Sequence, residues 1–187
     1  LILRATAELL NTQTPQELST TAIAAHAGIP VSSIYRYFPT LEEVLLELYL
    51  QTAGELRTAL FEIFEDTQAH PRWQDRLGAA LATQRRYLAR HPYYRALLMR
   101  FMVHRGPLAL EDEEHDQLVH FLKDRWQRGE DGFHGGDAQV VANTTIQIAL
   151  AMEDLIAAQK DRDASRPYSA ELNRLLEGYL STYLRTP

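Results

Sequence analysis

The sequence predicts an all-α protein of about nine helices. Apolar residues recur at spacings of three and four through most of the 187 residues. No segment shows the alternation of apolar and polar residues that is typical of a half-buried strand. Breaks between the helical patterns fall at His70-Pro71, at His91-Pro92 and at residues 129–136, which contain four glycines. Proline and glycine at these positions predict loops between helices rather than turns of a sheet.

The composition is that of a globular protein. Hydrophobic residues make up 45% of the chain, and no run of about eighteen apolar residues predicts a membrane-spanning helix. Cysteine is absent, which excludes disulfides and thiol nucleophiles and agrees with a reducing cytoplasm. The seven histidines do not follow a metal-ligand spacing. We therefore expect a cytoplasmic protein without a cofactor, a metal or a membrane partner. Because the chain begins at Leu1 within an apparent helix, we also expect residues before it.

Residues 19–38 predict two short helices joined by a tight turn. Ser19 is expected to cap the first helix, and Gly28 lies where a helix end needs a positive φ. Pro30 cannot continue the first helix but suits the start of the second. The outward positions of the second helix hold hydroxyl groups and Arg36. Two short helices, a glycine turn and such a face form a helix-turn-helix.

The remaining helices follow from periodicity and capping. Thr40 opens a long helix as the N-cap of a capping box, with Glu43 at its third position. The apolar stripe of this helix continues to Phe64, so it is expected to leave a first domain at residues 1–50 and enter a second at 51–187. Further helices are predicted at residues 1–11, 71–90, 93–104, 110–128, 137–160 and 169–184, with a polar loop at 161–168.

The motif in the helix-turn-helix carries a family resemblance. Ile23-Ala24-x-x-Ala27-Gly28-Ile29 is followed by Ile34-Tyr35-x-Tyr37-Phe38 and an acidic helix start. This pattern resembles the DNA-binding domain of TetR-family transcriptional regulators. The resemblance implies a dimer that binds a palindromic DNA operator, usually as a repressor, and that responds to a small molecule bound in the second domain.

The DNA-binding candidates lie on the two short helices. The resemblance places Ser33, Tyr35 and Tyr37 where family members contact phosphates. It places Val31, Ser32 and Arg36 near base edges, where an arginine can read guanine with two hydrogen bonds. The threonines that open the first short helix could bind phosphate through hydroxyl and backbone N–H groups. The full set is Thr20, Thr21, Val31, Ser32, Ser33, Tyr35, Arg36, Tyr37 and Thr40.

Two features of the first domain oppose strong DNA binding. Family members usually have lysine where this chain has Leu41, and serine where it has Pro30. Residues 1–50 carry two arginines and five glutamates, a net charge of −3, which phosphate repels. One alternative is therefore a helical protein that binds a small molecule or a partner and whose head binds DNA weakly. A helical enzyme is a further alternative, although no nucleophile elbow or glycine-rich phosphate loop supports it.

Aromatic, sulfur and polar side chains of the second domain are candidates for an effector cavity. They are Tyr87, Tyr94, Met99, Met102, His104, Phe121, Trp126, Asn143 and Gln147. Aromatic and methionine residues at helical spacing also suit an ordinary core. Asn143 and Gln147 lie one turn apart on a mostly apolar helix, and a buried amide needs a partner. That partner could be a ligand or the dimer interface.

The apolar pattern of the last two predicted helices indicates a dimer interface. The first is apolar on most sides, and the second carries a continuous apolar stripe, which favours a four-helix contact between two copies. The residues assigned to it are Ile148, Met152, Leu155, Leu172, Leu176, Tyr179, Leu180 and Tyr183. A monomer with a large core is the alternative.

Overall fold

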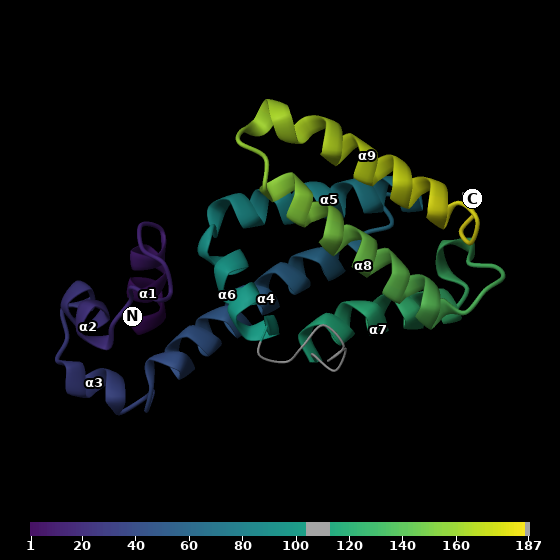
Figure 1. The fold of residues 1–187 in the computed structure, drawn as a ribbon. Helices are drawn as coiled ribbons and strands as arrows, with labels where there is room; N and C mark the ends of the chain where they lie inside the picture. The colour runs from purple at the N-terminus through teal and green to yellow at the C-terminus, as the bar shows by residue number, and fades with distance from the viewer. Residues whose placement is uncertain (104–112, 186–187) are drawn as a thin grey trace. The chain divides into compact units, whose positions relative to one another are not determined.

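A computed structural model describes residues 1–103 and 113–185. In this part of the chain it has nine α-helices, one short 3-10 helix and no strand (Figure 1). The all-α prediction is confirmed. The elements are α1 (Ile2–Leu10), α2 (Thr20–Ala27), α3 (Val31–Tyr35), α4 (Leu41–Glu65), α5 (Trp73–Arg90), α6 (Tyr93–Val103), α7 (Glu113–Gln127), η1 (Glu130–Gly132), α8 (Ala138–Ala157) and α9 (Arg162–Leu180).

The predicted helix ends are formed by local hydrogen bonds. The Ser19 side chain accepts a bond from the Ala22 N–H at 3.1 Å, which caps α2. Gly28 closes α2 with a φ of 67°, a backbone conformation that a residue with a Cβ rarely adopts. Thr40 Oγ1 accepts from the Glu43 N–H at 3.2 Å at the start of α4. These caps fix the boundaries of the helix-turn-helix.

The last helix differs from its prediction. The prediction of a polar loop at residues 161–168 is wrong, because α9 already begins at Arg162. Asp161 caps this helix by accepting a bond from the Ala164 N–H at 2.8 Å. Pro167 lies inside the helix, where its ring removes one backbone hydrogen bond. A proline close to a well-capped helix start therefore does not end the helix.

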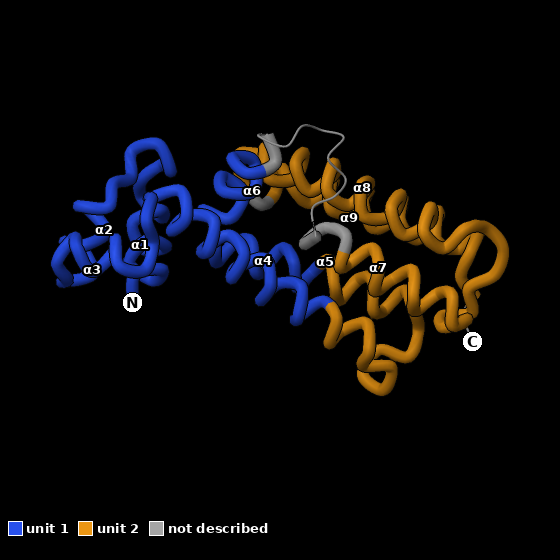
Figure 2. The backbone as a smooth tube through the Cα atoms, turned by 90° about the horizontal axis from the view of Figure 1, so that it is seen from below, with its two compact units in different colours: residues 1–60, 82–114 blue, residues 61–81, 115–187 orange. Residues whose placement is uncertain are grey.

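The chain divides into two compact units (Figure 2). Unit 1 contains residues 1–60 and 82–114, and unit 2 contains residues 61–81 and 115–187. The predicted boundary at residue 50 separates a DNA-reading head from the rest of the chain and stays a prediction.

The core of unit 1 is built around the helix-turn-helix. Ile23, Ile34 and Leu45 are fully buried there. Leu97 of α6 is fully buried in the same cluster, and the Tyr94 ring stacks on Tyr49 of α4 at 5.7 Å. Thus α6 contributes to the core of unit 1, although the sequence analysis assigned it to the second domain.

The core of unit 2 joins α8 and α9 to the start of α5 and to α7. Trp73, Leu122, Trp126 and Leu176 are buried in it. The helices α8 and α9 pack side by side in opposite directions (Figure 1).

Among the described helices, α8 alone is long and apolar enough to cross a membrane by length and composition, with a hydropathy of 1.3. Core helices of soluble proteins pass the same test. The side chains of Ala138, Val141 and Ala142 pack in the core of unit 2, so one side of α8 is used within the chain.

Candidate nucleic-acid interface

The helix α3 has one side in the core and one side free. Ile34 is fully buried, whereas Tyr37, two positions beyond the helix end, exposes 62% of its surface. Tyr35, Arg36 and Ser32 are also exposed. It is unusual for two neighbouring Tyr side chains, here Tyr35 and Tyr37, to be exposed, because burial of an aromatic ring is favourable. The free side of α3 is therefore the candidate interface.

The two short helices are joined by predicted site residues. The Tyr35 hydroxyl lies 3.0 Å from Thr20 Oγ1 at the start of α2, which places both hydroxyls at one spot. Thr21 is exposed beside Thr20, and Val31 and Ser33 are half-buried on α3. The structure therefore brings the predicted threonine and tyrosine hydroxyls together on one surface.

Arg36 lies against its neighbour Tyr37. Its Nη2 donates to the Tyr37 hydroxyl at 2.8 Å, and its guanidinium carbon is 4.8 Å from the centroid of the Tyr37 ring. This distance is within the range of a cation–π contact. The Tyr37 hydroxyl proton stays available for a further acceptor, such as a phosphate oxygen.

Two carboxylates of the head, Glu8 and Glu17, accept local hydrogen bonds or ion pairs. Glu8 accepts from His26 Nε2 at 2.8 Å and lies 3.7 Å from Arg4. Glu17 accepts from the Thr14 N–H at 2.8 Å and from its hydroxyl at 2.9 Å, and these two bonds lower the pKa of Glu17. Arg4 therefore offsets part of the charge of Glu8, whereas the bonds from Thr14 hold Glu17 in its ionised form.

A further contact was not predicted from the sequence. Arg100 of α6 donates from Nη2 to Glu42 Oε2 of α4 at 2.7 Å. This hydrogen bond raises the pKa of Arg100. The two residues are 58 positions apart, so no local pattern could have paired them.

The comparisons with known proteins agree with this geometry. Residues 2–48 match the family model of bacterial regulatory proteins of the tetR family. These residues therefore have the sequence pattern of the N-terminal domain of that family. The match covers α1 to α3 and the start of α4, which includes Arg36, Tyr37 and Glu42. No curated protein sequence matches the chain significantly.

Solved structures with the TetR-family fold resemble the whole chain. A TetR-family transcriptional regulator from Streptomyces coelicolor is 20% identical, with 98% of this chain and 97% of that chain covered and a TM-score of 0.70. One from Pectobacterium atrosepticum is 18% identical, with 100% and 93% covered and a TM-score of 0.71. A transcriptional regulator from Cytophaga hutchinsonii is 14% identical, with 98% and 97% covered and a TM-score of 0.72. At these identities the likeness shows the fold of the chain.

The residues predicted for the effector cavity of this TetR-family fold fall into both units. In unit 1, the Tyr87 hydroxyl donates to Glu55 Oε2 at 2.9 Å, and burial, followed by this bond, raises the pKa of Tyr87. Tyr94 is buried in the core of unit 1, and Met99 is exposed. His104 and the side chain of Met102 lie outside the described residues.

The other predicted effector residues are in unit 2. Phe121 stacks on Phe61 at 4.2 Å, and Trp126 is buried in the core. Asn143 is half-buried, but Gln147 is exposed. Gln147 is therefore not buried within a single chain, and its assignment to an effector or a dimer contact stays a prediction. Of the predicted residues, Trp126 lines a cavity of this unit.

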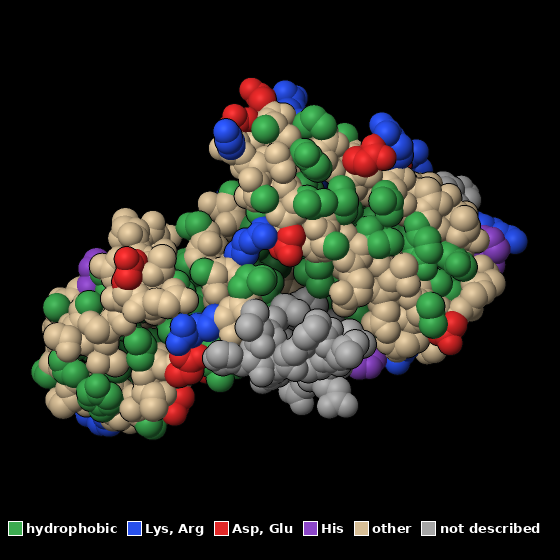
Figure 3. All heavy atoms as spheres, in the orientation of Figure 1, with side chains coloured by type: hydrophobic (Ala, Val, Ile, Leu, Met, Phe, Trp, Pro, Cys, Tyr) green, Lys and Arg blue, Asp and Glu red, His purple; other side chains and the backbone are tan. Residues whose placement is uncertain are grey.

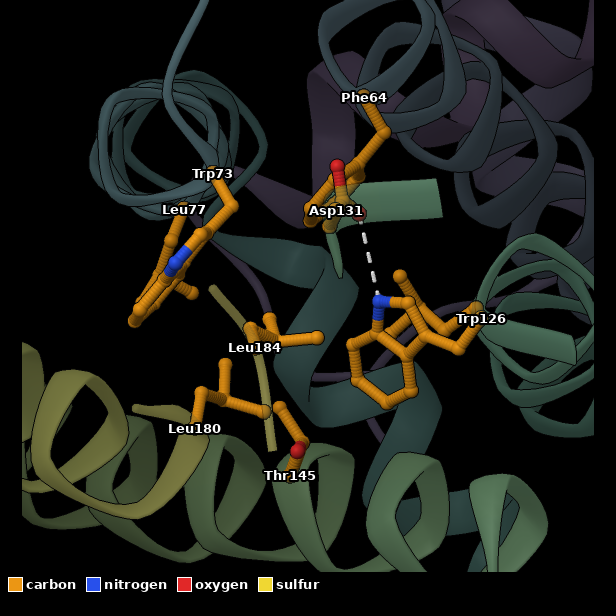
Figure 4. A pocket seen from close by; sticks show the side chains of 9 residues that line it. Phe64, Trp73, Leu77, Trp126, Asp131, Thr145, Leu180 and Leu184 are labelled. Carbon is orange, nitrogen blue, oxygen red and sulfur yellow. Dashed lines mark hydrogen bonds between the residues drawn. The ribbon is translucent and has the colours of Figure 1, made fainter. Parts of the chain in front are cut away.

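That cavity is small and mostly apolar (Figure 4). Its volume is about 20 Å³, which is room for about one water molecule. It is lined by Phe64, Trp73, Leu77, Leu122, Trp126, Asp131, Thr145, Leu180 and Leu184. The indole Nε1 of Trp73 is buried and has no hydrogen-bond partner among the described residues.

A buried ion cluster closes one side of the cavity. Asp131 accepts from Arg125 Nε at 2.8 Å and from Trp126 Nε1 at 3.3 Å, and it pairs with Arg76. Burial acts to raise the pKa of Asp131, but the bonds and charges of the two arginines outweigh it and hold the pKa below its ordinary value. No group of His, Asp and Glu among the described residues could hold a metal ion.

The predicted dimer stripe on α9 is largely an internal core. Leu172, Leu176 and Leu180 expose 3% of their surface or less within a single chain, so they leave almost no surface for a partner. Assigning these three leucines to the dimer interface is therefore wrong. Ile148, Met152, Tyr179 and Tyr183 are half-buried against the same core.

Other apolar side chains of α8 and α9 remain free. Leu155 exposes 50% and Leu175 40% of its surface, and Val140 and Tyr168 are also exposed. Figure 3 shows hydrophobic side chains gathered over these two helices. Of the predicted dimer residues, Leu155 belongs to this free apolar face.

Proposed function

We propose that the chain is a cytoplasmic, ligand-responsive transcriptional regulator that binds a palindromic DNA operator as a homodimer. The observation that carries the proposal is the free side of α3 and the two residues after it, which present Tyr35, Arg36 and Tyr37 within the segment that matches the TetR-family model. Repression is the proposed direction, because it is the usual one in this family. The proposal involves no enzymatic step and no membrane.

The proposed DNA contacts divide into two groups. Hydroxyl groups of Thr20, Thr21, Ser33, Tyr35 and Tyr37, with Thr40 at the start of α4, would contact the phosphate backbone and position the head. Val31, Ser32 and Arg36 would face base edges in the major groove. Most of these contacts are uncharged, so we expect a shallow salt dependence compared with arginine-rich DNA-binding proteins.

The proposed dimer uses the free apolar face of α8 and α9, defined here by Val140, Leu155, Tyr168 and Leu175. Apolar side chains of this size gain free energy when a second copy covers them. A dimer is also what a palindromic operator needs, since two reading helices must be held about 34 Å apart to reach successive major grooves.

The proposed effector binds in the helical part of the chain outside the head. The cavity beside Trp73 has room for about one water molecule, so a larger molecule would bind there only with rearrangement of the surrounding side chains. The unpartnered indole N–H of Trp73 would favour a molecule that offers it a hydrogen-bond acceptor.

Selection of DNA by the full chain tests the function. Random duplexes retained by the protein would be sequenced, and binding to the enriched site would be measured by fluorescence anisotropy at several salt concentrations. We expect an inverted-repeat site whose affinity falls with salt. Retention of no duplex above background would reject the proposed function.

One alternative function has an observation in its favour. The head carries a net charge of −3 and has Leu41 at the start of α4, both of which oppose phosphate binding. A protein that binds only a small molecule or a partner would show no salt-dependent DNA binding. A helical enzyme would require turnover of a substrate, and no side-chain arrangement among the described residues favours one.

A further inference from the structure

An ion pair inside unit 1 joins the start of α4 to α6. Arg100 Nε donates to both carboxylate oxygens of Glu42 at 3.1 Å, and Nη2 donates to Oε2 at 2.7 Å. The two side chains expose 27% and 43% of their surface. An ion pair so accessible to water adds little to the stability of the fold. Its place in the structure therefore suggests a role other than stabilisation.

Glu42 lies close to the candidate DNA interface. It is the second residue of α4, which starts at Leu41. Three chain steps lead from Tyr37 to Thr40, so these residues are within about 11 Å of each other. The free N–H groups of a helix N-terminus attract phosphate. A duplex held by the face of α3 would therefore pass near the first turn of α4.

The first turn of α4 is negatively charged, which opposes the approach of a DNA phosphate. Glu42 and Glu43 both lie in it, and residues 37–50 contain no lysine or arginine. Two free carboxylates near a phosphate would repel it, and at this distance water and salt reduce the repulsion but do not abolish it. Some other part of the chain has to supply the compensating charge.

We propose that Arg100 of α6 neutralises Glu42 and thereby permits DNA to approach the start of α4. The proposal rests on the proposed DNA-binding function. A guanidinium in bidentate contact makes the pair nearly neutral for a more distant phosphate. Glu43 is exposed and has no such partner among its described contacts, so it provides an internal comparison.

The packing of α6 holds Arg100 in place beside Glu42. Leu97 is fully buried in the core of unit 1, and Phe101 packs against Tyr49 with ring centroids 5.6 Å apart. Arg100 lies between these two anchors in the sequence. DNA affinity then depends on α6 as well as on the reading helix, because displacement of α6 would expose the Glu42 carboxylate.

The two partners of the pair have opposite expected effects on DNA binding. We would measure anisotropy of the enriched duplex with the full chain and with Arg100→Ala, Glu42→Gln and the double variant. By Coulomb's law with screening, Arg100→Ala should weaken binding roughly twofold per head and therefore about fourfold for a dimer. Glu42→Gln should increase affinity, because it leaves the positive charge of Arg100 uncompensated, and adding it to Arg100→Ala should restore binding.

Glu43→Gln is the matched control. It should increase affinity by the same factor with and without Arg100, since Glu43 is not paired with it. Circular dichroism of each variant checks folding, and Glu42→Gln alone remains decisive if Arg100→Ala does not fold.

Two results would overturn the inference while leaving the proposed function intact. In one, Glu42→Gln and Arg100→Ala weaken binding equally, which means that the pair only clamps the two helices. In the other, neither changes affinity. Absence of DNA binding by the unaltered chain would instead reject the proposed function and this inference with it.

Discussion

Tyr37 and Arg36 act on the same surface but in different ways. Tyr37 exposes 62% of its surface, and its hydroxyl accepts a hydrogen bond from Arg36 at 2.8 Å. A phosphate contact carries no sequence information, whereas a base contact does. Substitution of the two residues should therefore separate affinity from specificity.

We expect Tyr37→Ala to weaken binding about equally for all duplexes, because it removes a phosphate contact. Arg36→Ala should relax preference at one base pair by roughly 1–3 kcal/mol, because it removes a base contact. Competition binding against singly substituted operators measures both effects. Ser181→Ala, which removes an exposed hydroxyl at the end of α9, is the control and should have no effect. Uniform affinity across all these variants would contradict the assignment of α3.

Leu41 is a position at which a substitution is expected to strengthen DNA binding. It is half-buried against the core of unit 1, and a lysine there could pack its stem while the ammonium reaches solvent. Leu41→Lys should strengthen DNA binding and steepen the salt slope by about one counterion per head. Titrations at several salt concentrations measure the slope. A slope equal to that of the unaltered chain would mean that position 41 does not face phosphate.

At the scale of the elements, η1 brings several parts of unit 2 together through Asp131. Asp131 adopts a φ of 60°, and its carbonyl accepts from the Arg185 N–H at 3.2 Å. Its carboxylate meets Arg76 of α5 and Arg125 of α7. Asp131 thus connects two helices and the segment that follows α9 within unit 2.

Asp131→Asn should destabilise the chain by about 3–5 kcal/mol, because it leaves buried guanidinium groups uncompensated. The folded pKa of Asp131 lies below its ordinary value of 3.8. The stabilisation is therefore fully present above that value and is lost as the pH falls through the lowered pKa. Urea unfolding between pH 2 and pH 7, about the range over which a carboxylate titrates, should show a smaller acid-induced loss in Asp131→Asn. Asp124→Asn, an exposed control, should change stability by less than about 0.5 kcal/mol. Equal acid sensitivity of the two variants would contradict this role.

For the whole molecule, the decisive question is which face of α8 and α9 meets a second copy. The leucine stripe of α9 faces the core of its own chain, so Leu180→Asp would disrupt folding and would not report on assembly. The free apolar face, with Leu155 and Leu175, is where a charge tests the interface without entering the core.

Leu155→Asp and Leu175→Asp should each give folded monomers, because a dimer would have to bury the new carboxylate at a cost of several kcal/mol. The monomers should lose most operator affinity, since a single head engages only one half-site. Light scattering and anisotropy measure the two effects. Glu177→Gln, which is exposed on another side of α9 from Leu175, is the control and should change neither assembly nor affinity. A stable dimer in both Asp variants would place the interface elsewhere.

The sequence by itself determined the helices of the head and their ends. Ser19, Gly28 and Thr40 act through hydrogen bonds and backbone preferences that span only a few residues, so their roles could be predicted locally. The motif around Tyr35 and Tyr37 likewise predicted the TetR-family domain.

Only the tertiary structure decided which apolar and charged residues meet. An apolar stripe such as that of α9 is equally suited to an internal core and to a partner, and the choice depends on what packs against it. Arg100 and Glu42 are far apart in sequence and meet because α6 packs on the head. Pro167 remains within a helix because Asp161 caps it upstream and the rest of α9 packs against the core of unit 2. Local interactions therefore determined where the helices begin and end. Long-range packing decided which helix faces are buried and which charged residues form ion pairs.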